Sequence, residues 1–160
     1  MASDELPDLT AVLASVLQRV PAEHRPLLIA FAERLAAARY RGWAAQCADD
    51  RQRADLLACA RREEEIASRI EALDPASARI QRDILAANPD LEEINRALFA
   101  DRPLRQQLTL QARGERLGAA TWRAFASAAP DAAVRETLLA CARLEEDSAA
   151  VLEAILRAPE

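Results

Sequence analysis

The sequence predicts an all-α protein built on a four-helix bundle, and three observations support this fold class. The 160 residues suggest one domain, are rich in Ala, Leu, Glu and Arg, and include only three Gly, which favours helices. Apolar residues recur every three or four positions, and no alternating strand pattern is visible. Residues 32–73 and 114–155 also align without a gap at an offset of 82, with 20 of 42 pairs identical.

The repeat predicts two copies of an antiparallel helical hairpin. The run Leu56–Arg61 is identical to Leu138–Arg143. Three glutamates recur at the same offset, as the pairs Glu33 and Glu115, Glu63 and Glu145, and Glu64 and Glu146. A duplicated hairpin gives a bundle with pseudo-twofold symmetry, so a residue near the axis occurs twice, on opposite sides of one shared site.

An extra N-terminal helix is expected before the first hairpin. Asp8 can cap this helix, and apolar residues at helical spacing place it at 8–20. The first hairpin is expected at 26–73, with a turn at 48–50 between its two helices. Pro75 follows the hairpin and prevents its second helix from continuing.

A long crossover is expected between the two hairpins, at 74–101. It holds two short helical segments, which Pro89 separates. Asp90 and Glu93 have the spacing of a capping box for the second segment. The second hairpin is expected at 102–157. A connection of this length is longer than a simple up-down-up-down bundle needs, so the sequence predicts a bundle with one long crossover.

Each long helix of the two hairpins carries one glutamate on the apolar stripe that faces the core. At about 100° per residue, Glu115 lies in the middle of the stripe on the third long helix, and Glu63 does the same on the second. The core-facing glutamates are Glu33, Glu63, Glu115 and Glu145. Glu64 and Glu146 lie at the edges of their stripes and are second-tier candidates.

Four bare carboxylates cannot share an apolar core, because burial and mutual repulsion both oppose their charge. Hard divalent cations bridged by the carboxylates would neutralise them, and iron and manganese accept this chemistry. The four glutamates are therefore candidate metal ligands. The alternative is that they are structural acids, paired with arginines such as Arg34 and Arg116, hydrogen-bonded to Tyr40 and Trp122, or partly hydrated.

With these residues the chain resembles the ferritin-like superfamily of di-iron carboxylate proteins. Glu33, Tyr40 and Glu63 have the spacing of the metal motif of encapsulated ferritins, and residues 26–156 look like two such hairpins in one chain. The rubrerythrin-like members are similar in being already duplicated. The resemblance implies a dinuclear iron or manganese centre, with Glu33, Glu63, Glu115 and Glu145 as ligands and Tyr40 as a second-tier neighbour.

The sequence departs from this family at both histidine ligands. The family's Glu-x-x-His motifs would place a histidine three residues after Glu63 and after Glu145. Ile66 and Ser148 stand at those positions, and the only histidine of the chain is His24, near the start of the first long helix. A site of carboxylates alone binds first-row metals more weakly and selects them less well.

Three functions remain open after this departure, and the sequence does not decide whether the protein is an enzyme. The first is a ferritin-like protein with a histidine-less four-carboxylate site for iron or manganese handling or for oxygen or peroxide chemistry. The second is a metal-free ferritin-like descendant that acts as a structural or protein-interaction module. The third is a small-molecule binding bundle with an apolar cavity near Ile66 and Ser148.

Charge and cysteine content limit the partners and the compartment. The net charge of −5 argues against nucleic-acid binding, and no apolar run approaches the roughly 18 residues of a membrane span. The odd count of Cys47, Cys59 and Cys141 predicts free thiols in a reducing cytoplasm. Cys59 and Cys141 lie one turn before Glu63 and Glu145, so thiolate ligation is an alternative to simple packing.

The first long helix also has a second apolar face. It consists of Leu28, Phe31, Leu35, Ala38 and Gly42. This face exceeds what one bundle interface needs, so either the crossover and the N-terminal helix cover it or it forms a homodimer contact.

Overall fold

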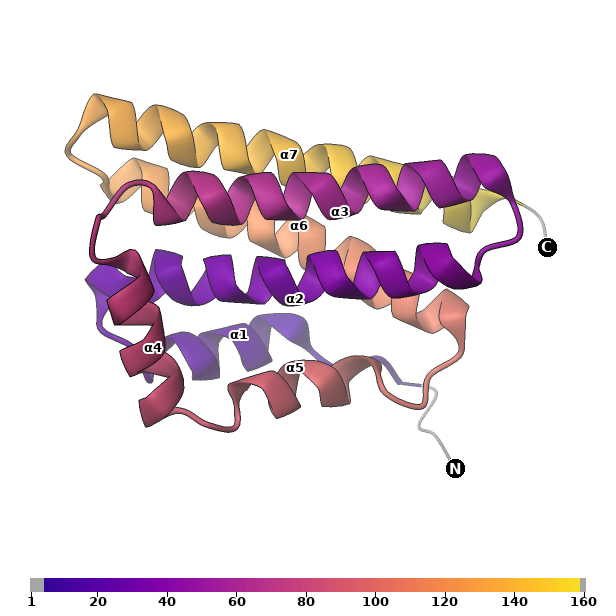
Figure 1. Ribbon diagram of the computed structural model, residues 1–160, viewed down its shortest axis with the longest axis horizontal. Helices are drawn as coiled ribbons and strands as arrows, with labels where there is room; N and C mark the ends of the chain where they lie inside the picture. Colours follow the sequence, from indigo (N-terminus) through magenta and orange to yellow (C-terminus); the bar gives the residue numbers. More distant parts are fainter. Residues whose placement is uncertain (1–4, 159–160) are drawn as a thin grey trace.

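The computed structural model describes residues 5–158, which form seven α-helices and one short 3-10 helix, with no strand (Figure 1). The prediction of an all-α protein is therefore confirmed. The helices are α1 (Leu9–Leu17), the 3-10 helix (Ala22–His24), α2 (Arg25–Gln46), α3 (Asp50–Glu71), α4 (Ser77–Ala87), α5 (Leu91–Phe99), α6 (Leu104–Ala128) and α7 (Ala132–Arg157).

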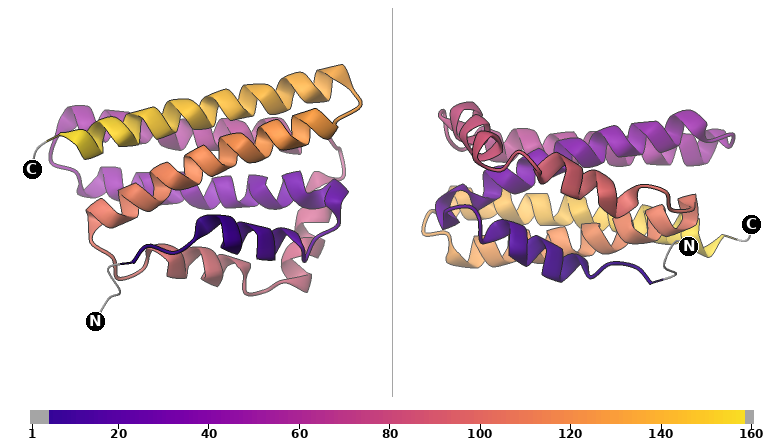
Figure 2. Two further views of the ribbon diagram at one scale, coloured as in Figure 1. Left: turned by 180° about the vertical axis from the view of Figure 1, so that it is seen from behind. Right: turned by 90° about the horizontal axis from the view of Figure 1, so that it is seen from below.

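The four long helices α2, α3, α6 and α7 lie side by side along the longest axis of the molecule (Figure 1). Helix α2 packs along α3, α6 packs along α7, and α3 also contacts α7. Helix α4 crosses one end of the bundle, and α1 and α5 run along the side that lies away from α3 and α7 (Figures 1 and 2). The long connection between α3 and α6 therefore becomes two helices that pack on the outside of the bundle.

Aspartates begin the first helix and the second helix of each hairpin. The Asp8 carboxylate accepts hydrogen bonds from the amides of Thr10 and Ala11, and α1 begins as expected but ends at Leu17, three residues short of its expected end. Asp49 caps α3 and Asp131 caps α7 in the same way, and these two residues are related by the offset of 82. Each cap satisfies amides that have no partner within the helix, so the two tight turns start the following helices at equivalent places.

The capping box expected at Asp90 and Glu93 is not formed. The backbone of Asp90 is already helical (φ −88°, ψ −5°), whereas a capping residue usually has an extended backbone that turns its side chain toward the first amides. The Asp90 carboxylate instead accepts two hydrogen bonds of 2.9 Å from Arg19, and Glu93 pairs with Arg96. Arg19 thus ties the segment after α1 to the start of α5.

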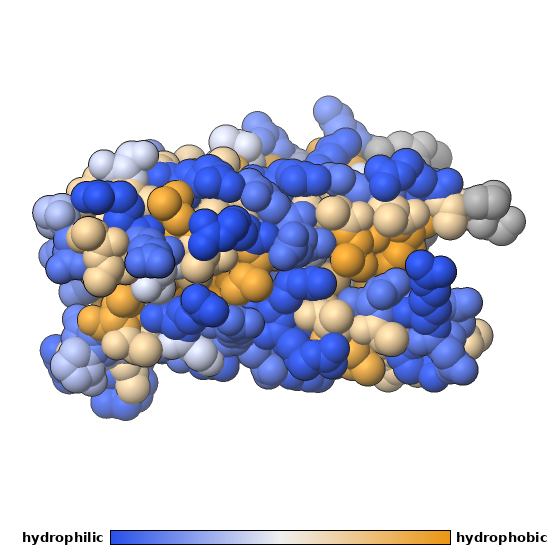
Figure 3. Space-filling model, turned by 90° about the horizontal axis from the view of Figure 1, so that it is seen from above, coloured by the Kyte–Doolittle hydropathy of each residue, from blue (hydrophilic) through white to orange (hydrophobic). Residues whose placement is uncertain are grey.

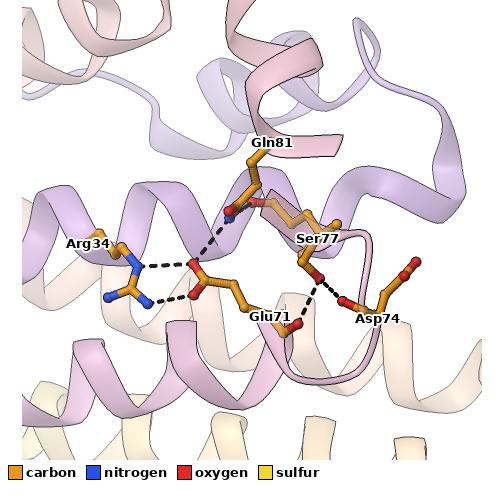
Figure 4. Close-up of polar contacts among 6 residues, drawn as sticks. Arg34, Glu71, Asp74, Ser77 and Gln81 are labelled. Carbon is orange, nitrogen blue, oxygen red and sulfur yellow. Dashed lines mark hydrogen bonds and ion pairs between the residues drawn. The ribbon is translucent and has the colours of Figure 1, made fainter. Parts of the chain in front are cut away.

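Ion pairs on the surface of the two hairpins recur at the offset of 82. Arg34 of α2 pairs with Glu71 of α3, and this carboxylate also accepts a hydrogen bond from Gln81 of α4 (Figure 4). In the second hairpin, Arg116–Glu153 is the equivalent of Arg34–Glu71. In the same way, Arg123–Glu146 is the equivalent of Arg41–Glu64. Because these pairs are about half exposed, each contributes little stability. Their recurrence shows that the helices have the same register in both hairpins.

The apolar core is divided into two clusters. The cluster near α4 contains Ile66, Ile70 and Trp122, and the cluster at the opposite end contains Leu56 and Leu152. The four predicted glutamates lie between residues of the first cluster and residues of the second along each long helix. The bundle therefore has an acidic layer between two apolar layers.

Helices α1 and α5 cover part of the second apolar face of α2. Leu28, Phe31 and Leu35 line a pocket together with residues of α1, α5 and α6, whereas Ala38 and Gly42 are exposed. On the opposite side, Figure 3 shows the face over α3 and α7, where hydrophilic side chains predominate and hydrophobic ones form small separate patches. Within residues 5–158, every helix is too short or too polar to serve as a membrane span.

Candidate metal centre

The four core-facing glutamates are buried and come from the four long helices. The exposed fraction is 8% for Glu33, 0% for Glu63, and 1% for both Glu115 and Glu145. Glu33, Glu63 and Glu145 each have a carboxylate oxygen within 4.8 Å of the others. The fourth glutamate, Glu115, lies close enough to Glu145 for their carboxyls to share a hydrogen bond. The acidic layer is therefore one cluster to which every long helix contributes a side chain.

Glu115 is held by two donors from different helices. The Tyr40 hydroxyl of α2 donates to Glu115 Oε1 at 2.5 Å, and the Gln111 amide of α6 donates to the same oxygen at 2.7 Å. Arg39 donates in turn to the Gln111 carbonyl oxygen, at 2.9 and 3.0 Å. Glu115 is thus oriented by two neutral donors, while Arg39 supports Gln111 by hydrogen bonds and places a positive charge near the cluster.

Glu145 and Glu63 each accept one hydrogen bond from a neutral side chain. The Trp122 indole nitrogen donates to Glu145 Oε1 at 2.9 Å, and the Ser148 hydroxyl donates to Glu63 Oε1 at 3.1 Å. Ser148 stands where the family pattern would place a histidine. The hydroxyl therefore contacts the cluster from the same position, as a hydrogen-bond donor to a carboxylate.

The cluster contains more acceptors than donors. Glu63 Oε2 and Glu115 Oε2 are fully buried and accept no hydrogen bond within the described part of the chain. No arginine among residues 5–158 forms an ion pair with any of the four carboxylates. A buried acceptor without a donor is destabilising by about 1–3 kcal/mol, so these oxygens are suited to a proton or a cation.

The surroundings of the cluster favour protonated carboxyls when no cation is present. Burial raises the pKa of Glu33 from an ordinary 4.5 to about 7, in spite of hydrogen bonding to the Glu63 and Glu145 carboxyls. Burial also raises the pKa of Glu63 and of Glu145 well above the ordinary value, and the charges of the neighbouring carboxylates add to the effect. Desolvation is the main cause, because the apolar layers on both sides exclude water.

Of the three second-tier candidates Glu64, Glu146 and Tyr40, two lie outside the cluster and one lies within it. Glu64 and Glu146 point away from the cluster, and their half-exposed carboxylates pair with Arg41 and Arg123. Only Tyr40, which is fully buried and bonded to Glu115, belongs to the site. Glutamates at the edge of the apolar stripe therefore lie at the surface of the bundle, where an arginine of the neighbouring helix neutralises each of them.

All three cysteines are free thiols, as the sequence predicts. Cys59 and Cys141 are fully buried, and burial raises the pKa of the Cys141 thiol to about 12. A thiol in this state is a small apolar side chain rather than a nucleophile. His24, the one histidine of the sequence, lies in the 3-10 helix before α2, outside the cluster.

Ile66 and Ser148, where an apolar cavity was expected, are closed off from solvent within the described residues 5–158. Both side chains have an exposed fraction of 0%, and Ile66 belongs to the apolar cluster near α4. The core is therefore packed at these two positions. The apolar pocket lies instead beside α1 and α5.

Sequence reasoning missed Gln111, Arg39 and Gly118. Gln111 lies one helical turn before Glu115 on the same stripe, and a polar residue at that position was the available signal. Gly118 is the equivalent of Ala36 at the offset of 82, so the loss of a methyl group in one repeat was the signal there. The link from Arg39 to Gln111 joins residues 72 positions apart and has no local signal.

Gly118 makes room for the Glu145 carboxylate. A Cβ atom at position 118 would lie 2.5 Å from Glu145 Oε1 and 2.8 Å from its Cδ. We expect Gly118→Ala to push this carboxylate away from the Trp122 indole. Gly42→Ala is the matched control, because a Cβ there meets no heavy atom within 4 Å and should stabilise the helix by about 1 kcal/mol.

Urea denaturation of the two variants measures this effect. Gly118→Ala should be less stable than Gly42→Ala by about 1 kcal/mol or more, because the disturbed carboxylate is buried and hydrogen-bonded. Equal stability of the two variants would mean that the Glu145 side chain moves freely within the cluster.

Comparisons with protein-family models, with curated proteins and with solved structures gave no match for this chain. Inference about its function therefore depends on the geometry and chemistry of the cluster.

Proposed function

We propose that this chain is a ferritin-like bundle of two duplicated hairpins that binds iron or manganese at Glu33, Glu63, Glu115 and Glu145. The repeated ion pairs and the repeated aspartate caps support the duplication. The convergence of one buried glutamate from each long helix supports the metal centre. Metal handling or oxygen or peroxide chemistry is the activity that such a centre would serve.

The observation that carries the proposal is the balance of charge in the cluster. Three carboxylates have oxygens within 4.8 Å of one another, and the side-chain donors that contact the four glutamates within residues 5–158 are all neutral. Such a group of acids needs either protons or a cation. A divalent ion would satisfy the two oxygens that have no donor and would remove the repulsion between the carboxylates.

The residues present fit a hard divalent ion better than a soft one. All four candidate ligands are carboxylates, which suit manganese and iron(II) more than metals that prefer thiolate. When bound, the ion would supply Lewis-acid and redox chemistry. The chain's own residues hold the carboxylates in place: Tyr40 and Gln111 orient Glu115, Trp122 orients Glu145, and Ser148 orients Glu63.

Elemental analysis tests the proposal directly. The full chain is dialysed against a chelator and then loaded with manganese(II), or with iron(II) without oxygen. We expect about two ions per chain if the centre is dinuclear, as in the ferritin-like bundles. The double variant Glu63→Gln/Glu145→Gln should bind none, whereas Glu64→Gln/Glu146→Gln removes two exposed acids and should bind as the wild type does. Equal uptake by both variants would refute the site.

A metal-free module is the second candidate function. The neutral donors around the cluster and the raised pKa of Glu33 favour it, because protonated carboxyls can share hydrogen bonds with one another. Such a protein would serve as a structural or protein-interaction module in the protonated form. It would retain no metal after loading, and its melting temperature would not change when manganese or iron is added.

A further inference from the structure

A pocket of about 190 Å³ lies between α1, α2, α5 and α6, on the side of the bundle that Figure 2 shows covered by α1 and α5. Aliphatic and aromatic side chains from all four helices form most of its wall. The small residues Ala32, Gly114 and Gly118 also line it, which leaves space over α2 and α6. Glu33, Glu115 and Glu145 are part of the same wall, so the pocket extends to the carboxylate cluster.

The two covering helices turn incompletely buried apolar faces toward this pocket. Helix α1 has no fully buried residue, although Val12, Leu13 and Val16 form an apolar stripe that lines the pocket. Helix α5 has one fully buried residue, Leu91, and its other apolar residues on this side are only partly buried. An apolar molecule in the pocket would remove this surface from water, which is favourable.

The polar groups of the wall are mostly satisfied already. Arg39 donates to Gln111 and Asn95, and its guanidinium lies 3.7 Å from the centre of the Phe99 ring. Thr121 donates to a carbonyl of its own helix. Among the pocket-lining residues, Glu115 has an oxygen without a donor. An anionic ligand would meet three glutamates against one arginine, whose guanidinium is already engaged by Gln111, Asn95 and the Phe99 ring. A neutral ligand with one hydrogen-bond donor would find an acceptor at Glu115.

We propose that the pocket binds a neutral, mainly apolar small molecule, with at most one hydrogen-bond donor, beside the carboxylate cluster. Its size supports a single bicyclic ring, because an apolar cavity of about 150 Å³ accommodates benzene. The proposal goes beyond metal binding and does not require it, since the pocket and the cluster are separate features of the metal-free protein. If both are occupied, the small molecule lies next to the metal ligands.

Indole is a suitable probe, and calorimetric titration of the full chain in a chelator measures its binding. Gly114→Leu should fill the pocket: a Cβ atom there fits, with Leu9 Cδ1 at 4.0 Å as its nearest neighbour, and the rest of the side chain extends into the space. Gly42→Leu is the matched control on the exposed face of α2. We expect indole affinity to fall at least tenfold in Gly114→Leu and to stay within twofold of wild type in Gly42→Leu.

Two further measurements keep the test decisive. Ala32→Leu fills the same pocket from α2 and should also weaken indole binding at least tenfold, even if Gly114→Leu fails to fold. Indole-3-acetate carries a carboxylate on the same ring and should bind at least tenfold more weakly than indole. Absence of indole binding to wild type, unchanged binding in the folded filling variants, or tighter binding of the acetate would each overturn the proposal. All measurements exclude metal, so failure of the metal centre gives a separate result.

Discussion

The metal-free protein should lose stability as the pH rises from about 5 to about 8, which is the reverse of what salt-bridged carboxylates produce. The folded pKa of Glu33 is raised to about 7, and those of Glu63 and Glu145 are raised well above 4.5. The folded state therefore retains protons that the unfolded state releases. The stabilisation is fully present below the ordinary pKa of 4.5 and is lost as the pH passes through the folded pKa.

The expected effect is large for a protein of this size. For Glu33 alone, a rise in pKa from 4.5 to about 7 corresponds to about 3 kcal/mol of lost stability. Below pH 4.5 the slope reverses, because the ion pair with Arg34 lowers the pKa of Glu71 and is lost when this acid is protonated. Urea denaturation in a chelator, at half-unit steps between pH 4 and pH 9, should therefore give a maximum near pH 5.

Two variants and the addition of manganese test whether the glutamate cluster causes this dependence of stability on pH. Glu33→Gln should make the slope shallower, with Glu63 and Glu145 accounting for what remains. Glu64→Gln, which removes an exposed acid paired with Arg41, should leave the slope unchanged. Manganese should reverse the slope, because binding requires deprotonated carboxylates and therefore strengthens as the pH rises. A metal-free stability that is constant or rises between pH 5 and pH 8 would contradict the burial of ionisable carboxyls in this layer.

Glu63→Gln should stabilise the metal-free protein by about 2 kcal/mol at pH 8 and should abolish its stabilisation by manganese. The substitution removes a buried carboxyl whose ionisation is unfavourable in the folded state, and it keeps the shape of the side chain. Ser148 can still donate to the remaining carbonyl oxygen, and the introduced amide can donate to the Glu33 carboxylate, which is within hydrogen-bond reach. The same substitution removes one of the proposed metal ligands, so its effect should change sign when manganese is present.

Urea denaturation at pH 8, with and without manganese(II), measures both effects. Glu64→Gln is the control one residue away, and its stability should stay within about 0.5 kcal/mol of wild type, with a normal response to manganese. If Glu63→Gln destabilised the metal-free protein, the carboxylate would have a favourable role without metal. If the variant still gained stability from manganese, Glu63 would not be a ligand.

Helical periodicity alone was sufficient to predict the all-α class and the inward direction of the four glutamates. In an α-helix the direction of a side chain depends on its position modulo about 3.6 residues, so Glu63 is necessarily on the same face as Cys59 and Ile70. Glu64 and Glu146, one residue further, lie at the edge and reach arginines on the surface. Because the two hairpins are repeats, the side-chain directions predicted for Glu63 and Glu64 apply equally to Glu145 and Glu146.

Local sequence predicted helix starts and ends less reliably, because residues distant in the sequence can bind the side chain of an expected cap. The spacing of Asp90 and Glu93 predicted a capping box, but Arg19, 71 residues away, binds the Asp90 carboxylate. The end of α1 was also predicted too late, because the apolar pattern continues through Val20 although the helix stops at Leu17. In both cases a contact or a turn outside the pattern decided the outcome.

The sequence by itself determined that four acids face the interior of a helical bundle, because this depends only on the geometry of each helix. The tertiary structure decided what surrounds them. Tyr40 meets Glu115 across 75 residues, and Ser148 meets Glu63 across 85. Gly118 makes room for the Glu145 carboxylate, and α1 and α5 border an apolar pocket beside the cluster. These features depend on the distances between helices, which the loops and the packing of whole layers fix and which no local pattern encodes.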